Sequence, residues 1–222
     1  MHTAEDPKDH VRYTAKELIA RAADHDFDVL AITNHNRVTF SQDLYSYAKK
    51  RGILLIPGME ITVRRRHVLL LNPPIRGDNG VYRDFRALLA FKNPRTLIVA
   101  PHPFFPGSYS LNRFLLRNLD LFDALEYCHF YSPMINFNRR AVEVCETYGI
   151  PLMGNSDSHF FSQLGATYSL IDAEKNVDSL FAAIRENRIQ VVSRPLKHRE
   201  MGSIFNRFLR MKIRGTIKGK KG

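Results

Sequence analysis

Short apolar runs alternate with longer amphipathic segments along most of the chain. Eight of these runs are continuously apolar rather than alternating, which is typical of strands that are buried on both faces. They span residues 29–33, 53–57, 67–71, 97–100, 124–127, 151–154, 167–171 and 190–193. The pattern therefore predicts seven or eight strands inside a covered sheet.

The segments between the runs have helical periodicity. Residues 14–26 begin with Thr14-Ala-Lys-Glu17, which is the signature of a capping box, and then place Leu18 and Ile19 on one apolar face. Further helices are predicted over residues 40–51, 81–92, 110–118, 135–148 and 177–186. Because strands and helices alternate, we expect right-handed βαβ units and a parallel sheet, either open and doubly wound or closed into a barrel.

Composition narrows the class of protein. The chain has 222 residues, of which 44% are hydrophobic and 25% charged, so one sizeable globular domain is expected. No apolar stretch approaches the roughly 20 residues needed to span a bilayer, and the polar first residues contain no signal-peptide core. The only cysteines, Cys128 and Cys145, have no metal or redox spacing. Their number suits a reducing compartment, so a cytoplasmic location is expected.

Positive charge is concentrated at the C-terminal end. The net charge is +11, but residues 194–222 hold ten of the 33 Lys and Arg residues and one of the 22 acidic residues. Residues 202–222 are predicted to form a basic amphipathic helix and a flexible tail. Three interpretations remain open, namely a packed final helix, a contact to nucleic acid and a weak contact to an anionic membrane.

Histidine and acidic residues follow several of the predicted strands. His35 follows the first run, Glu60 the second, His102 the fourth, and Asp157 and His159 the sixth. In a β/α barrel the C-terminal ends of the strands open onto one face, so these side chains are expected to converge. Each residue alone has a structural explanation as a cap or turn, but together they favour a site for zinc, manganese or iron.

Six segments, in this order, resemble the PHP (polymerase and histidinol phosphatase) family. They are Met-His-Thr, Phe-Asp-Val-Leu-Ala-Ile-Thr-Asn-His-Asn, Ile-Pro-Gly-Met-Glu-Ile-Thr, His-Val-Leu-Leu-Leu, Ala-Pro-His-Pro and Gly-Asn-Ser-Asp-Ser-His. The resemblance runs from residue 1 to about residue 193. It implies an α/β fold, a distorted seven-stranded β/α (TIM-like) barrel over residues 1–201, and two or three divalent metal ions (Mn, Zn or Fe).

The resemblance also implies the ligands, matched position by position. It assigns His2, Glu60 and Asp157 to a first metal, His35 and His159 with a loop Asp to a second, and Glu60 with His67 and His102 to a third. The loop acid is Asp6 or Asp9, and we favour Asp6. Glu60 would then bridge two metals.

Two departures from the family pattern stand out. The family begins with Asp-Leu-His-x-His-Thr, whereas this chain begins at Met1-His2-Thr3. We therefore hypothesise that the true start lies upstream and that the first strand is missing from this sequence. Asn34 stands where Asp is commoner beside His35. Since an amide cannot ionise, Asn34 is expected to support the ligands rather than to bind metal.

The activity implied by the resemblance is phosphate ester hydrolysis by metal-activated hydroxide. The substrate class is a phosphorylated small molecule or short oligonucleotide, as in nucleoside 3',5'-bisphosphate phosphatases and 5'-to-3' oligonucleotide exonucleases. His159 or His102 is expected to protonate the leaving group. Arg37, Arg65 and Arg113 are candidate phosphate contacts, each with the alternative of a solvated arginine.

Three rival functions remain. Histidinol phosphate is another substrate class of the family, and no residue decides for or against it. A PHP domain that has lost catalysis and acts as a binding or stabilising module is favoured by the missing first His, whereas the retained ligands speak against it, namely His2, His35, Glu60, His67, His102, Asp157 and His159. A metal-dependent amidase would carry a Lys at a strand end, and none of the eight runs ends that way. The oligomeric state stays open.

Overall fold

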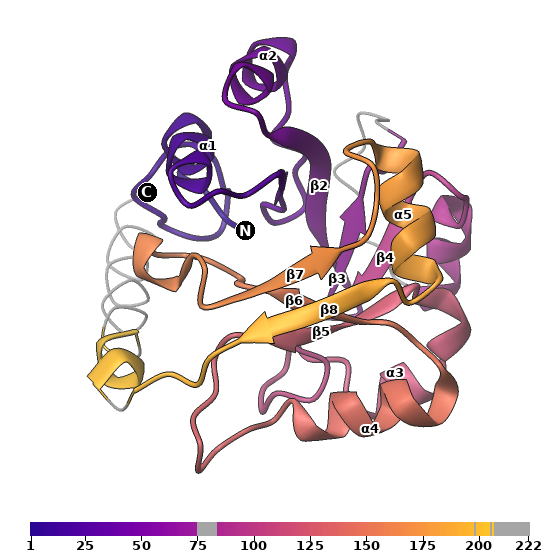
Figure 1. The fold of residues 1–222 in the computed structure, drawn as a ribbon. Coiled ribbons are helices and arrows are strands. Elements are labelled where there is room, and N and C mark those ends of the chain that lie inside the picture. Colours follow the sequence, from indigo (N-terminus) through magenta and orange to yellow (C-terminus); the bar gives the residue numbers. More distant parts are fainter. Residues whose placement is uncertain (75–83, 198, 205, 207–222) are drawn as a thin grey trace, which may run out of the picture.

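The computed structural model describes residues 1–74, 84–197, 199–204 and 206. Its main element is a curled sheet of six strands, which lie side by side in the order of the sequence (Figure 1). These strands are β1 Val29–Ile32, β2 Leu54–Val63, β3 Arg66–Leu71, β4 Leu97–Ala100, β5 Ala124–Cys128 and β6 Leu152–Asn155. The remaining two, β7 Thr167–Ile171 and β8 Ile189–Ser193, form a separate antiparallel pair, and a helix lies in the connection between them. All eight predicted runs therefore form strands.

The prediction of a parallel sheet is wrong for part of it. β1–β2, β4–β5 and β5–β6 are parallel, but β3 is antiparallel to both β2 and β4. The cause is the tight turn at Arg64 and Arg65, whose φ angles of 47° and 67° are both positive. Two successive residues with positive φ are typical of a hairpin turn that joins antiparallel strands. β2 runs on to Val63 for this reason, six residues beyond its predicted end at residue 57.

The helices lie close to their predicted positions. They are α1 Ala15–Ala23, α2 Gln42–Lys50, α3 Arg113–Leu116, α4 Arg139–Tyr148 and α5 Val177–Arg185, with short 3₁₀ segments at η1 Phe85–Phe91, η2 Leu119–Leu121 and η3 Phe161–Gln163. Thr14 caps α1 and forms the predicted capping box with Glu17. Residues 81–83 of the predicted helix over 81–92 lie outside the described residues. The helix predicted over residues 110–118 is reduced to the single turn of α3.

Both faces of the sheet are buried. On β4, Leu97 and Val99 pack in one cluster with Phe181 of α5, whereas Ile98 and Ala100 belong to a second cluster on the opposite face. That second cluster includes residues of α3 and α4. Alternation between two apolar clusters explains why the strand sequences are continuously apolar. Figure 1 shows α5 and α4 on different sides of the strands.

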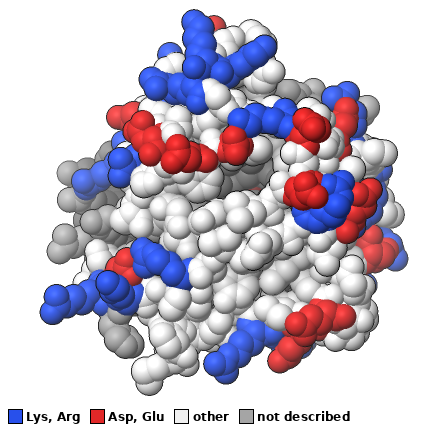
Figure 2. Space-filling view, in the orientation of Figure 1, with Lys and Arg blue, Asp and Glu red and all other residues white. Residues whose placement is uncertain are grey.

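The β7–β8 pair lies directly against β6. Gly154 donates its N–H to Ser169 Oγ at 2.9 Å, and Ser169 Oγ donates to the Gly154 carbonyl at 3.1 Å. A Cβ atom on Gly154 would lie 2.5 Å from the Tyr168 carbonyl oxygen, so only glycine allows this approach. Figure 2 shows that the face over β7 and β8 carries few charged side chains.

The architecture is thus an α/β half-barrel. The predicted closed barrel of seven strands, and an additional first strand upstream of Met1, stay predictions. Of the predicted basic segment 202–222, residues 205 and 207–222 lie outside the described residues, and Ile204 is buried against Ala166 and Leu196. The division at residue 201 stays a prediction. Within the described ranges, no helix combines the length and the hydropathy that a membrane span requires.

Candidate metal centre

The predicted ligands lie at one end of the curled sheet. His35 follows β1, His102 follows β4, and Asp157 and His159 follow β6, while Glu60 and His67 stand on the paired strands β2 and β3. The segment before α1 completes the set. There, Thr33 donates its N–H to the Met1 carbonyl at 2.8 Å, and His2 donates its N–H to the Ser158 carbonyl at 3.1 Å. These two bonds hold His2 between the end of β1 and the loop after β6.

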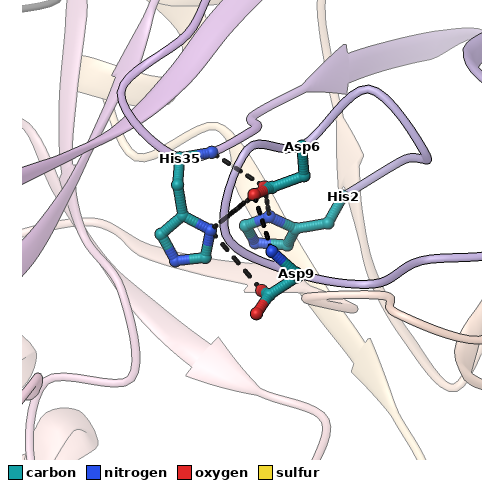
Figure 3. A group of neighbouring side chains, drawn as sticks. All are labelled: His2, Asp6, Asp9 and His35. Atoms are coloured by element: carbon teal, nitrogen blue, oxygen red, sulfur yellow. Dashed lines mark hydrogen bonds and ion pairs between the residues drawn. The ribbon is translucent and has the colours of Figure 1, made fainter. Parts of the chain in front are cut away.

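One group of ligand atoms surrounds Asp6 (Figure 3). Asp6 Oδ2 lies 2.7 Å from His2 Nδ1 and 3.0 Å from His35 Nδ1, and it accepts the His35 N–H at 2.8 Å. Asp6 Oδ1 accepts the Asp9 N–H at 3.0 Å. Asp9 Oδ2 itself lies 2.9 Å from His159 Nε2. The structure therefore brings both candidate loop acids into the cluster, with Asp6 between two imidazoles and Asp9 beside a third.

Glu60 occupies the centre of the cluster. Its Oε2 lies 3.0 Å from His35 Nε2 and 3.6 Å from His2 Nε2. Its Oε1 lies 3.0 Å from His67 Nδ1 and 3.7 Å from His102 Nε2. The side chain is 3% exposed. One buried carboxylate thus contacts four imidazoles that come from four separate parts of the chain.

Asp157 and His159 form the third part of the cluster. Asp157 Oδ1 lies 3.3 Å from His2 Nε2. His159 Nδ1 lies 2.9 Å from the backbone carbonyl of Asp157. Because a carbonyl oxygen only accepts, this nitrogen carries the proton of the neutral ring, and Nε2 is left as the atom that can bind a cation.

Two of the site residues have an unusual backbone. His102 has φ 30° and Asp157 has φ 39°, in the left-handed region that favours glycine. Such conformations cost about 1–3 kcal/mol each and gather at functional sites, where the surrounding structure holds them in place. At His102 the backbone N–H is held by Glu126 Oε2 at 2.7 Å. Both residues lie two positions after the end of a strand, β4 for His102 and β6 for Asp157.

Electrostatics favour protonated imidazoles in the absence of metal. Burial alone would lower the pKa of His35, but hydrogen bonds to Asp6 and Glu60 outweigh it and raise the pKa to about 10. Burial likewise opposes protonation of His102, while its bond to Glu60 and the charge of Glu126 raise the pKa to about 9. The histidines therefore take protons where cations would otherwise neutralise the carboxylates.

The pKa values of two carboxylates, those of Glu60 and Asp157, are shifted downward. Burial would raise the pKa of Glu60, but the charge of His67 and the hydrogen bonds from His102 and His35 hold it well below its usual range. The pKa of Asp157 is likewise held well below its ordinary value, because the bond to His2 and the charge of His159 outweigh burial. A concentration of ionised carboxylates in a buried site calls for cations.

The residues fit divalent cations. Three groups, His2/Asp6/Asp9/His35, His2/Asp157/His159 and His35/Glu60/His67, each offer ligand atoms that lie within 4.8 Å of one another. His67 Nδ1 is buried and has no hydrogen-bond partner, although Glu60 Oε1 is only 3.0 Å away. Two polar atoms that are close but do not share a hydrogen bond are arranged as ligands of a common ion would be. Imidazole and carboxylate ligands without thiolates suit zinc, manganese or iron.

Two buried polar residues were missed in the sequence. Glu126 lies in β5, and burial raises its pKa to about 8. Its Oε1 has no hydrogen-bond partner. The available signal was a lone carboxylate inside an apolar run.

Gln163 accepts the N–H groups of His159 and Phe160 at 2.7 and 2.8 Å and approaches His129 Nε2 at 2.9 Å. Nothing in the local sequence marks it.

Asn34 has the supporting role that was expected. It is fully buried, and its Oδ1 accepts the Thr3 N–H at 2.9 Å. Its Nδ2 donates to Thr3 Oγ1 at 2.8 Å and to Thr39 Oγ1 at 2.7 Å. Asn34 therefore ties the residue after His2 to the loop after His35.

The candidate phosphate-binding arginines are placed differently from one another. Arg37 donates to the Glu5 carbonyl at 3.1 Å, beside Asp6. Arg65 lies in the turn between β2 and β3, and the guanidinium of Arg113 lies over the Phe114 ring, 5.5 Å from its centroid. Arg37 is thus tied to the loop of the metal cluster, and phosphate contacts by all three stay predictions.

The fold and the site define the class as an α/β protein with a candidate divalent-metal centre at one end of its curled sheet. The comparisons with known proteins agree. The family model described as PHP domain matches residues 2–99, and the model described as PHP-associated matches residues 136–189. These two models together cover most of the chain, which therefore belongs to the PHP family. This confirms the resemblance inferred from the sequence.

Solved structures share the fold at low sequence identity. A two-domain protein from Bacteroides vulgatus ATCC 8482, described as containing a predicted PHP-like metal-dependent phosphoesterase, superposes with a TM-score of 0.68 at 17% identity, over 87% of this chain and 63% of its own. This chain thus spans less than two thirds of that protein. PsfC from Pseudomonas syringae PB-5123 superposes with a TM-score of 0.59 at 17% identity, over 89% of this chain and 88% of its own.

An amidohydrolase from Chromobacterium violaceum, with sulfate bound and no metal, gives a TM-score of 0.54 at 17% identity, with 85% of this chain and 95% of that one covered. At such identities the likeness concerns the fold. No curated protein matches the chain in sequence.

Proposed function

We propose that the chain is a metal-dependent phosphoesterase that hydrolyses phosphate esters of nucleotides, as a nucleoside 3',5'-bisphosphate phosphatase or a 5'-to-3' oligonucleotide exonuclease does. The observation that carries the proposal is the position of Glu60, whose two oxygens lie between 3.0 and 3.7 Å from four imidazoles. A carboxylate in this position can bridge cations that lie on either side of it. Two or three divalent ions would fit the three groups of ligands.

The residues that would hold the ions fall into those groups. Asp6 and Asp9 with His2 and His35 would hold one, Asp157 with His2 and His159 a second, and Glu60 with His35, His67 and His102 a third. Bound there, the cations would supply Lewis acidity that activates water and neutralises the phosphoryl oxygens.

The chain itself supplies proton donors and substrate contacts. A histidine whose ring nitrogen binds a cation cannot donate a proton from that nitrogen. With two of the three groups occupied, His102 or His159 could be left without a cation, and that histidine would then protonate the leaving oxygen. Arg37 would contact a phosphate beside Asp6, because its guanidinium is already anchored to the loop at Glu5.

Phosphate release from adenosine 3',5'-bisphosphate tests the proposal, with manganese added and then chelated. The wild type should release phosphate only with metal present, and Asp157→Asn should lose most of the activity. Asp120→Asn, which changes an exposed carboxylate paired with Arg86, is the matched control and should keep it. Release that persists in the chelator, or in Asp157→Asn, would overturn the proposal.

A further inference from the structure

An exposed tyrosine lies directly against the metal cluster. The ring of Tyr109 stacks on the ring of His67, with centroids 4.6 Å apart and an angle of 29° between the planes. Although it contacts a buried residue, Tyr109 is 54% exposed. The free face of a ring that already stacks on a site residue is a flat apolar surface against which a ligand ring can stack.

The backbone of Tyr109 is fixed on both sides. His67 donates its N–H to the Tyr109 carbonyl at 2.8 Å. Arg66 Nη1 donates to the flanking carbonyls of Ser108 and Ser110 at 2.8 and 2.7 Å, and its guanidinium lies over the Phe114 ring at 5.1 Å. The strand that positions His67 therefore positions Tyr109 as well. A ring that is held in place before binding loses little entropy when a ligand stacks on it.

The loop that carries Tyr109 is aromatic and contains no charged residue of its own. Residues 103–110, Pro-Phe-Phe-Pro-Gly-Ser-Tyr-Ser, contain no Lys, Arg, Asp or Glu. Within this loop, the Phe105 ring lies 6.4 Å from the His102 ring and 5.3 Å from the Phe137 ring, measured between centroids. Phe137 is 39% exposed. The loop therefore suits a planar apolar group. The two arginines that lie against it are already engaged, Arg66 with the Ser108 and Ser110 carbonyls and Arg140 over the Phe104 ring.

We propose that Tyr109 determines substrate specificity by stacking against the planar ring of a nucleobase while the phosphate lies at the metal cluster. The inference rests on the proposed function and makes its substrate class specific, since it selects nucleotides over phosphate esters of sugars and amino alcohols. Stacking tolerates any base, because every base has a π face. We therefore expect discrimination between a base and no base, with little preference among bases.

Calorimetric titration of the metal-loaded protein with AMP and with ribose 5-phosphate tests the proposal without turnover. The wild type should bind AMP about tenfold or more tightly, which is within the range of one base stacked on an aromatic ring. Tyr109→Ala should remove most of that difference, and Tyr109→Phe should keep it. Tyr148→Ala is the control, because Tyr148 is 59% exposed on α4 and outside the site.

The results separate this inference from the proposed function. Equal affinity for the two ligands in the wild type, or an unchanged ratio in Tyr109→Ala, would overturn the role of Tyr109 even if phosphate is released. The expected ratios without phosphate release would support stacking and contradict the phosphoesterase proposal. Absence of binding by both ligands would overturn the stacking proposal.

Discussion

His35 Nε2 lies 3.0 Å from Glu60 Oε2, and the backbones of the two residues are joined by a parallel bridge. Glu60 donates its N–H to the Asn34 carbonyl at 3.1 Å, and the Glu60 carbonyl accepts the Asn36 N–H at 2.8 Å. The central carboxylate is thus fixed by the sheet itself and not by a mobile loop. Ligands on rigid elements hold a metal geometry more accurately than ligands on loops.

Glu60→Gln should lower the number of metal ions that the centre binds. The amide keeps the shape of the side chain but removes the negative charge that faces four imidazoles. We expect a loss of activity larger than the about 10–100-fold that follows loss of an outer-shell partner. Metal per chain, measured by mass spectrometry, and phosphate release check this. Glu143→Gln, at an exposed position of α4, should change neither quantity, and full metal content in Glu60→Gln would contradict the bridging role.

The metal-free protein should lose stability as the pH rises. Hydrogen bonds to carboxylates outweigh burial and raise the pKa of His35 to about 10 and of His102 to about 9. A raised folded-state pKa gives stability that is complete below the unfolded value of about 6.5 and is lost as the pH passes the folded value. Burial raises the pKa of Glu126 to about 8, which acts in the same direction.

The melting temperature in chelator should therefore fall between about pH 6.5 and pH 9, in the interval set by these shifts. At the acid end, the lowered pKa of Glu60, which comes from its imidazole partners, gives stability that is lost below about pH 4. Because metals replace protons on the imidazoles, added metal should raise the melting temperature more at pH 8 than at pH 6. A melting temperature in chelator that stays flat from pH 6.5 to pH 9 would argue against the protonated imidazole network.

The strands could be read from the sequence because burial on both faces leaves continuous apolar runs. Their direction could not, since an apolar run such as that of β3 looks the same in parallel and antiparallel pairs. The decisive feature is the turn at Arg64 and Arg65, whose positive φ angles are conformations that arginine rarely adopts. Sequence propensity therefore gives no warning of the reversal there.

His35, His102, Asp157 and His159 could be proposed as ligands because metal chemistry restricts residue type and all four follow predicted strands. The segment before α1, with His2 and the loop acids, and His67 on β3 were proposed only from the family resemblance. The residues that contact these ligands were harder to predict. Gln163 contacts His129, which lies 34 residues earlier in the chain, and no periodicity or motif encodes this. Tyr109 looks like an ordinary loop residue until the contact between its carbonyl and the His67 N–H is seen. Contacts between residues far apart in sequence are visible only in the folded chain.

Gln163→Leu should weaken metal binding without touching a ligand. Gln163 holds the His159 and Phe160 N–H groups at 2.7 and 2.8 Å and orients the loop that carries His159. It lies 2.9 Å from His129 Nε2, and burial lowers the pKa of His129 to about 4, so that the neutral ring accepts from the amide. We expect metal affinity to fall by about 10–100-fold, measured by calorimetric titration with zinc or manganese.

Gln163→Glu is the informative partner of that variant. Its carboxylate can still accept both N–H groups but has no amide N–H to donate to His129, so partial recovery of metal affinity is expected. Gln190→Leu, on the exposed side of β8, controls for the general loss of a glutamine. Equal metal affinity in Gln163→Leu and the wild type would contradict the positioning role.

Gly154→Ala should destabilise the fold and the site together. Its Cβ would lie 2.5 Å from the Tyr168 carbonyl and 3.0 Å from the carbonyl carbon, both backbone atoms that cannot rotate away. Moving the β7–β8 pair away from β6 should cost about 1–3 kcal/mol, as overpacking does. It should also shift β6, the strand that leads to Asp157. Urea unfolding and metal titration measure the two effects.

At Gly202 an added Cβ meets nothing within 4 Å, so Gly202→Ala is the matched control and should leave metal affinity unchanged. Wild-type stability in Gly154→Ala would mean that the β7–β8 pair can move without cost. The close contact between β6 and β7 would then not position Asp157.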